Sequence, residues 1–233
     1  MIRSALILVL LLSLVPMVSA DLLSRDIVPL EEVRPGMKCY GFSCFSGNKM
    51  ERMEVEIIGV MDGGNRFNST IVGRVDSPSV NRGGIMSGMS GSPVYFGDRL
   101  VGAMAYAYPY AKEPICGITP IESMSRLWKL RDSPGRFTPG LPRRDILSQP
   151  MPGQANELMP IGLAVNTRGF KAEGAGYLAP DFTNIPGSSE LKPGNAVGVG
   201  LLKGDLSAVA FGTVTDVHEN KLLAFGHASF GIG

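Results

Sequence analysis

The chain has 233 residues and a formal net charge of +1, with acidic and basic residues interspersed along it. This balance excludes a strongly basic surface, so the composition indicates neither nucleic acid nor an anionic membrane surface as a partner. The 30 glycines, 17 prolines and 18% charged residues are typical of a protein with short strands and many turns. We therefore predict a mainly β fold.

Residues 1–20 are predicted to be a signal peptide and not part of the fold. Arg3 supplies a positive charge, residues 5–15 are largely apolar, and residues 18–20 (Val-Ser-Ala) place small side chains at the expected cleavage site. The apolar run is short for a membrane span, although an uncleaved N-terminal anchor is the alternative. We expect export to the periplasm, the cell envelope or the medium, and no integral membrane span after cleavage.

The next hundred residues read as a series of short strands followed by one helix. β-Branched or alternating stretches predict strands at residues 37–45, 55–60, 70–75, 94–96 and 100–108. A Gly97-Asp98 turn joins the last two strands as a hairpin. The stretch Thr119-Pro120-Ile121-Glu122 has the form of a capping box and predicts a short helix at residues 120–131.

A loop rich in glycine and serine lies between the third and fourth predicted strands. Its stretch Gly88-Met89-Ser90-Gly91-Ser92-Pro93 has the Gly-x-Ser-Gly-x-Pro form of the nucleophile loop in trypsin-like peptidases. Glycines beside a serine leave backbone N–H groups uncovered, as an oxyanion hole requires. We predict Ser90 as the nucleophile, with the N–H groups of Gly88 and Ser90 as the oxyanion hole. An ordinary turn ahead of a strand is the alternative.

The second half of the chain is predicted to form another β module. Residues 132–158 are rich in proline and lack a sustained period, which indicates a linker. The predicted organisation is a first β module at residues 21–131, this linker, and a second β module at residues 159–233. Strands are expected at residues 159–165, 207–217 and 221–226. Because the chain stops soon after the last strand, we expect the second module to be incomplete.

The chain has two histidines that could act as a general base for Ser90. His218 lies beside a charged hairpin turn and is predicted to be solvated. His227 follows a strand that looks buried and is preceded by a glycine, a position where a base could face a cleft. Beside the serine loop, His227 is therefore the predicted base, and a structural histidine is the alternative.

The acid that would orient this histidine has three candidates. Asp76 ends a predicted strand 14 residues before Ser90, and we name it as the catalytic aspartate. A turn residue ahead of Pro78 is the alternative for Asp76. Asp205 and Asp216 remain open as the acid.

The cysteines form an odd set for an exported protein: Cys39, Cys44 and Cys116. One disulfide with a free thiol, or no disulfide at all, are both open. No group of cysteines and histidines has metal-ligand spacing, so we expect neither a metal nor a cofactor.

These motifs give the chain a resemblance to the SpoIVB-type serine peptidases. The resemblance is carried by Gly88–Pro93 and Ala224-Phe225-Gly226-His227, with framing stretches at residues 29–41, 102–121 and 204–215. It implies a trypsin-like pair of β-barrel modules in which Ser90 attacks a protein or peptide substrate and His227 takes its proton.

The order of the two motifs differs from that family. In the sporulation protein the histidine motif precedes the serine motif, whereas here it follows, so a permuted or truncated barrel pair is expected. A non-catalytic relative, acting as an envelope binding or assembly module, is the alternative function.

Overall fold

The structure is a computed structural model that describes residues 26–47, 49–64, 67–108, 111–126, 158–162, 164–168, 190–205, 207–218 and 221–227. The predicted signal peptide, residues 132–157 of the predicted linker and the six residues after His227 lie outside these ranges. Among the described residues, no helix has the length and apolar character that a membrane span needs.

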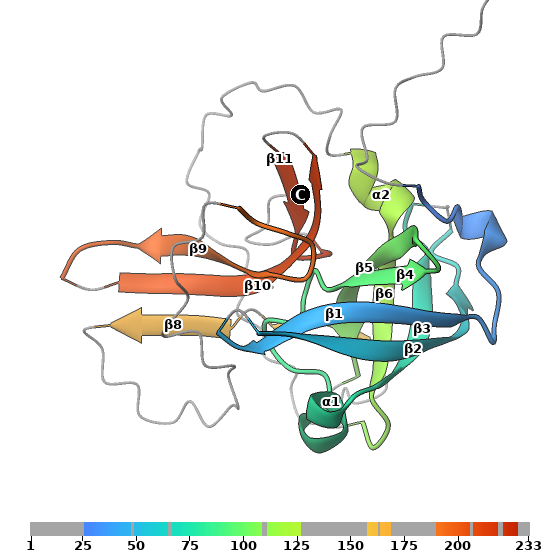
Figure 1. Cartoon of the computed structure of the whole chain (residues 1–233), viewed down its shortest axis with the longest axis horizontal. Helices are drawn as coiled ribbons and strands as arrows, with labels where there is room; N and C mark the ends of the chain where they lie inside the picture. Colours follow the sequence, from blue (N-terminus) through green and yellow to red (C-terminus); the bar gives the residue numbers. More distant parts are fainter. Residues whose placement is uncertain are drawn as a thin grey trace, which may run out of the picture.

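Most of the described first half forms a closed six-stranded β-barrel. Its strands are β1 (Lys38–Ser46), β2 (Lys49–Met61), β3 (Thr70–Asp76), β4 (Pro93–Phe96), β5 (Arg99–Ala107) and β6 (Ile115–Pro120). They pair antiparallel in the order β4-β1-β2-β3-β6-β5, and the pairing of β4 with β5 closes the ring (Figure 1). This arrangement confirms the predicted mainly β class and the trypsin-like barrel.

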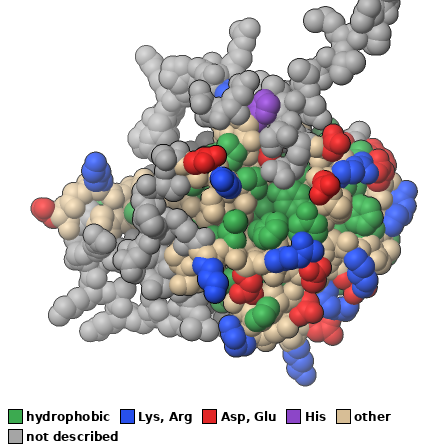
Figure 2. Space-filling view, viewed as in Figure 1, with side chains coloured by type: hydrophobic (Ala, Val, Ile, Leu, Met, Phe, Trp, Pro, Cys, Tyr) green, Lys and Arg blue, Asp and Glu red, His purple; other side chains and the backbone are tan. Residues whose placement is uncertain are grey.

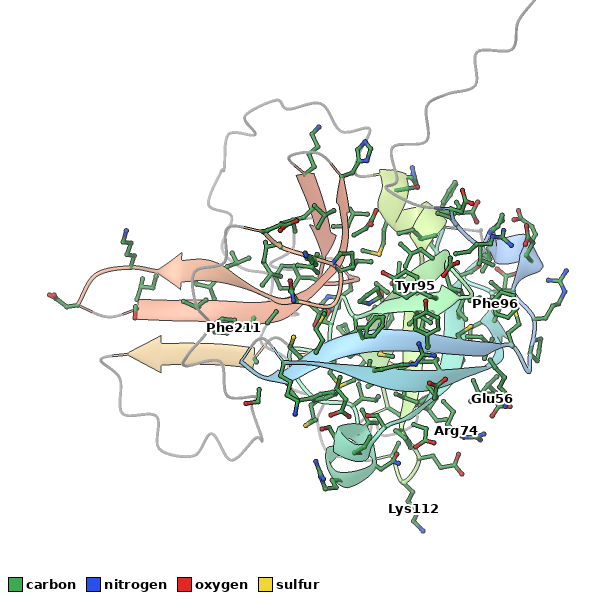
Figure 3. All side chains as sticks on the ribbon, in the orientation of Figure 1. Glu56, Arg74, Tyr95, Phe96, Lys112 and Phe211 are labelled. Carbon is green, nitrogen blue, oxygen red and sulfur yellow. The ribbon has the colours of Figure 1, made fainter. Side chains whose placement is uncertain are left out.

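Alternation along the strands decides which side chains fill the barrel. In β2, Met53, Val55 and Ile57 are buried, whereas Glu54 is exposed and Glu56 faces outward beside Arg74 (Figure 3). This period of two is expected when one face of a strand packs on a core and the other meets water. The main core cluster also includes Val28, Ile71, Val75, Val80, Met89, Met104, Cys116 and Ile118.

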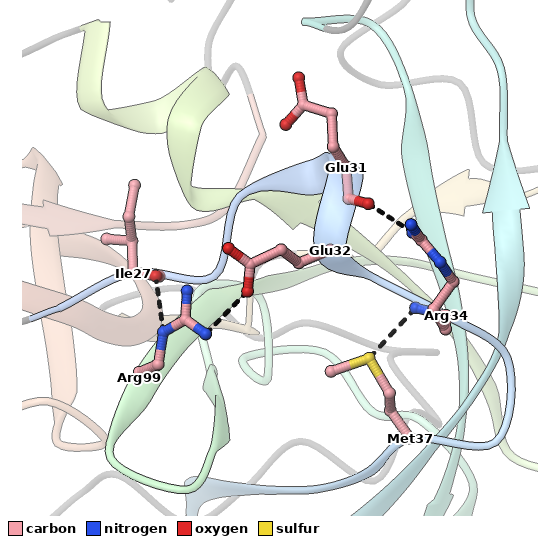
Figure 4. Close-up of polar contacts among 6 residues, drawn as sticks. All are labelled: Ile27, Glu31, Glu32, Arg34, Met37 and Arg99. Carbon is pink, nitrogen blue, oxygen red and sulfur yellow. Dashed lines mark hydrogen bonds and ion pairs between the residues drawn. The ribbon is translucent and has the colours of Figure 1, made fainter.

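The segment before β1 is held against the β4–β5 hairpin. Val28 N donates to Leu100 O at 2.9 Å, and Leu100 N donates to Asp26 O at 2.8 Å. The Arg99 guanidinium adds a hydrogen bond to Ile27 O and an ion pair with Glu32 (Figure 4). Since this ion pair is solvent-exposed, the backbone bonds contribute more to holding the segment.

Four further strands form a second antiparallel sheet. They are β8 (Ala164–Arg168), β9 (Ala196–Leu202), β10 (Ser207–His218) and β11 (Lys221–Ala224). The long β10 pairs with each of the other three and links β8 and β9 at its start to β11 at its end (Figure 1). One short strand from after the predicted linker, β7 (Met159–Pro160), instead pairs with β5 of the barrel.

Two short helices are present among the described residues, although the sequence predicted one. Of the helix expected at residues 120–131, the structure describes α2 (Ile121–Ser125), and residues 127–131 lie outside the described ranges. The additional helix, α1 (Pro78–Gly83), begins at a proline after Ser77, whose side chain accepts a hydrogen bond from Val80 N. At six residues, α1 is too short to produce a recognisable period of 3.6 residues.

The predicted capping box at residues 119–122 does not form. Thr119 and Pro120 instead end β6, a strand that the sequence analysis did not predict, and Pro120 makes no side-chain cap bond. The Glu122 carboxylate accepts a hydrogen bond from Leu30 N at 2.8 Å and so ties α2 to the 3-10 turn η1 (Leu30–Glu32). The Glu122 carboxylate thus binds a backbone N–H far away in the sequence and not one at the start of its own helix, as the capping-box motif predicts.

The surface carries no single-sign field on the face shown in Figure 2, where Lys and Arg alternate with Asp and Glu around an apolar patch. This distribution agrees with the near-zero net charge of the sequence.

All three thiols should be unreactive in the folded protein. Cys39, Cys44 and Cys116 are free and buried, and burial raises the pKa of Cys39 to about 11 and that of Cys116 to about 12. Because the thiolate is the reacting species, Ellman's reagent at pH 8 should titrate no thiol in native protein and all of them in guanidinium chloride. A thiol that reacts at once in the folded state, or is missing after unfolding, would contradict this burial.

Candidate active site

Ser90 lies in the loop between α1 and β4. Gly88 has a φ of 92° and Gly91 a φ of 96°, a region that favours glycine over every other residue. Ser92 N donates back to Met89 O at 2.9 Å, which closes a tight turn around Ser90. The glycine spacing seen in the sequence therefore serves to fold the chain closely around this serine.

Two threonines of β10 hold the serine loop from the side of the second sheet. Thr213 Oγ1 donates to Gly88 O at 2.9 Å, and Thr215 Oγ1 donates to Gly91 O at 2.8 Å. Thr213 N also donates to Ser90 O at 2.8 Å. Both threonines are buried, where a lost partner would leave a carbonyl unsatisfied, so β10 fixes the loop firmly.

The barrel holds the same loop from its other side. Gly91 N donates to Met104 O at 2.8 Å, and Met104 N donates to Ser92 O at 2.9 Å, which joins the loop to β5. A Cβ atom on Gly91 would lie 2.1 Å from Thr213 O and 2.5 Å from Phe225 N. Only glycine fits between these backbones.

The predicted base, His227, lies in the turn that packs against Ser90. Ser90 Oγ donates to Phe225 O, and this same carbonyl accepts a hydrogen bond from His227 N at 2.5 Å. Phe225 has a φ of 69°, the one positive φ at a non-glycine residue in the described part of the chain. Such backbone costs about 1–3 kcal/mol and is common at functional sites. The fold thus brings Ser90 and His227 to one strained turn.

The His227 ring lies beside Tyr106 and against residues that follow the predicted linker. The centroids of the His227 and Tyr106 rings are 6.1 Å apart. His227 Nε2 is 3.1 Å from Ile161 O. Because a carbonyl can only accept a hydrogen bond, Nε2 carries the proton in this arrangement, so it is not ready to take a proton from Ser90.

The predicted oxyanion hole is also engaged. Gly88 N donates to Gly162 O at 3.0 Å, so a carbonyl oxygen already lies on one of its two donors. Within the described ranges, Ser90 N makes no backbone hydrogen bond. A carbonyl oxygen is the kind of group that such donors are arranged to receive.

Ser90 is fully buried, with 0% of its surface exposed. A peptide cannot reach its hydroxyl while the chain has this arrangement. Since His227 Nε2, Gly88 N and Ser90 Oγ each contact a backbone carbonyl of the chain itself, the site is closed.

The three candidate acids occupy different surroundings. Asp76, at the end of β3, is exposed and accepts a hydrogen bond from Asn81 Nδ2 at 2.7 Å, and no contact among the described residues joins it to Ser90 or His227. Asp205 is exposed in the turn between β9 and β10. Asp216 is fully buried in β10, next in sequence to a threonine that holds the serine loop.

Within the described residues, no group of three or more His, Cys, Asp or Glu side chains is placed to hold a metal ion.

The sequence of the barrel matches a known protein family. Residues 24–124 match the model of the SpoIVB peptidase S55 family. No curated protein and no solved structure matches the chain. The matched segment contains β1 to β6 and the serine loop, which confirms the resemblance there, and it ends before His227.

Replacement of Gly91 by alanine should destabilise the protein far more than the same change at Gly97. Both glycines have positive φ, so each variant pays about 1–2 kcal/mol of backbone strain. A Cβ at Gly97 meets nothing within 4 Å, whereas a Cβ at Gly91 meets backbone atoms of β10 and Phe225. Urea unfolding should therefore show an additional loss of roughly 2 kcal/mol or more for Gly91→Ala. Equal losses in the two variants would mean that the serine loop is not held between the two sheets.

Proposed function

Residues 24–124 match the SpoIVB peptidase S55 family, and on this premise we propose that the chain is an exported serine endopeptidase. Ser90 is its nucleophile and His227 its general base. The N–H groups of Gly88 and Ser90 form the oxyanion hole. The observation that carries this proposal is that the Ser90 hydroxyl and the backbone N–H of His227 both donate to the carbonyl of Phe225.

The reaction requires a rearrangement of two hydrogen bonds. The Ser90 hydroxyl has to turn from Phe225 O toward the His227 ring, and His227 Nε2 has to leave Ile161 O. The single proton of the neutral ring must also pass, through solvent, from Nε2 to Nδ1, which leaves a free electron pair on Nε2. Ser90 Oγ then attacks the substrate's peptide carbonyl as Nε2 takes the hydroxyl proton. This proton passes to the departing amine, and a water molecule hydrolyses the acyl-enzyme by the same steps in reverse.

An acid behind His227 would hold its ring and stabilise the imidazolium. Asp76 is the acid named from the sequence, but its exposed carboxylate is bonded to Asn81 on the surface. The burial of Asp216 on β10 favours it for this role, since buried carboxylates are kept in place by specific partners.

A non-catalytic relative is the second candidate function. It is favoured by the complete burial of Ser90 and by the engagement of Gly88 N, since both features would also suit a loop kept for its structure. The two candidates differ in whether Ser90 reacts with a serine-directed reagent.

Export is proposed from the N-terminal sequence alone. Secretion of the full chain from a bacterial host should yield a mature protein whose first residue is Asp21, because residues 18–20 provide the cleavage site. N-terminal sequencing measures this directly. Recovery of the product with Met1 intact in the soluble cytoplasmic fraction would reject the signal peptide.

Loss of either member of the proposed pair should abolish nearly all activity. Ser90→Ala should remove labelling by a fluorophosphonate probe, and His227→Ala should slow it by roughly 10³-fold or more, because nucleophile and base act as a unit. Ser92→Ala is the matched control in the same loop, since the one side-chain hydrogen bond of Ser92 Oγ to the described part of the chain is a 3.5 Å contact with Thr213 Oγ1. Probe labelling that survives in Ser90→Ala would refute the assignment.

The acid is tested with the same assay. Asp216→Asn should slow labelling and shift its pH profile, whereas Asp76→Asn should leave both close to those of the unchanged protein. The opposite ranking would identify Asp76 as the acid.

A further inference from the structure

Residues 158–162 return to the barrel and extend its sheet beside the serine loop. In β7, Pro160 pairs with Tyr106 and Met159 with Ala107, antiparallel to β5. The next residue continues the pairing, since Ile161 N donates to Ala105 O at 2.8 Å. An extended peptide added to a sheet edge is a common mode of peptide recognition.

Two consecutive carbonyls of this segment contact two groups of the proposed catalytic machinery. Ile161 O lies 3.1 Å from His227 Nε2, and Gly162 O accepts the hydrogen bond from Gly88 N at 3.0 Å. Backbone carbonyls of the segment therefore contact both the proposed base and the proposed oxyanion hole. The backbone of a bound substrate would be expected to make contacts of this kind.

The side chains of the segment fit the surface beneath them. Ile161 is 4% exposed and belongs to the main core cluster of the barrel. A Cβ on Gly162 would lie 2.9 Å from Ser87 Oγ, so the chain passes close to the serine loop at this point. Pro160, the residue before Ile161, is exposed.

We propose that residues 158–162 are a built-in, substrate-like occupant of the peptide cleft that holds the site closed. The inference rests on the proposed peptidase function and deepens it. Because residues 158–162 pair with β5 as an extended strand, the cleft should bind an extended peptide in the same way. It accepts a branched apolar side chain at the position of Ile161, followed by a small residue at the position of Gly162.

The geometry is that of an inhibitor and not of a productive substrate. Ile161 O lies on a protonated Nε2, and the Ser90 hydroxyl donates to Phe225 O and not to the histidine. Because the segment is part of the same chain, its effective concentration at the cleft is high. A protein substrate or a regulator that competes for the β5 edge would open the site.

The test compares labelling of Ser90 in two variants of the full chain. Ile161→Glu places a charge in the buried position and should expel the segment, while Leu201→Glu places the same charge at an exposed apolar position of β9, outside the segment, and is the matched control. If the cleft is open in about a tenth of the molecules, expulsion should raise the rate of fluorophosphonate labelling about tenfold. Leu201→Glu should label at the original rate. Thermal melting checks the fold, and Ile161→Ala replaces the glutamate variant if that variant unfolds.

A peptide added in solution gives a readout that does not need catalysis. A fluorescent peptide with the sequence of residues 158–163, Leu-Met-Pro-Ile-Gly-Leu, should bind the Ile161→Glu protein and not the unchanged one. The same peptide with Ile161→Asp should not bind. In the Ile161→Glu protein, the unaltered peptide should also slow labelling of Ser90.

The outcomes separate this inference from the proposed function. Equal labelling and equal peptide binding by the unchanged and Ile161→Glu proteins would overturn the occupied cleft. Selective peptide binding by Ile161→Glu without any labelling would support the occupied cleft and reject the peptidase.

Discussion

The site depends on the close approach of two backbones on either side of Gly91. Its N–H bonds to Met104 O of β5, its carbonyl accepts from Thr215 of β10, and there is no room for a side chain between them. The closed barrel supplies one wall of this contact and the second sheet supplies the other. Without the second sheet the serine loop would lose the hydrogen bonds that fix Gly88 O, Ser90 O and Gly91 O.

This dependence explains why the candidate site is a composite of distant parts of the chain. The segment matched by the peptidase family carries the serine loop, whereas the histidine follows β11 of the second sheet. The strained backbone at Phe225 puts its carbonyl within reach of both Ser90 and His227, so a single turn couples the two sheets to the proposed chemistry. Chain order can differ from that of the sporulation protein because only the final geometry matters to such a pair.

The sequence predicted those features that depend on local pattern. Alternation in β2 and β10 and the glycines around Ser90 are local, so these strands and the serine loop could be read directly from the sequence. Contacts between segments that are distant in the sequence could not be predicted in this way. Glu122 binds Leu30 N and not a helix N-terminus, and β6 lacks the alternation that marks an isolated strand. The pairing of Ile161 with Ala105 of β5 could not be predicted from the periodicity of the sequence, because the two residues are 56 positions apart (161 − 105).

The most direct test of the account is the crystal structure of the full chain after its reaction with a fluorophosphonate. We expect a covalent bond from Ser90 Oγ to phosphorus. The phosphonyl oxygen should be bound by the N–H groups of Gly88 and Ser90, with His227 Nε2 within hydrogen-bond reach. Residues 158–162 should have left the β5 edge. An adduct on another residue, or one on Ser90 with His227 Nε2 still bonded to Ile161 O, would contradict it.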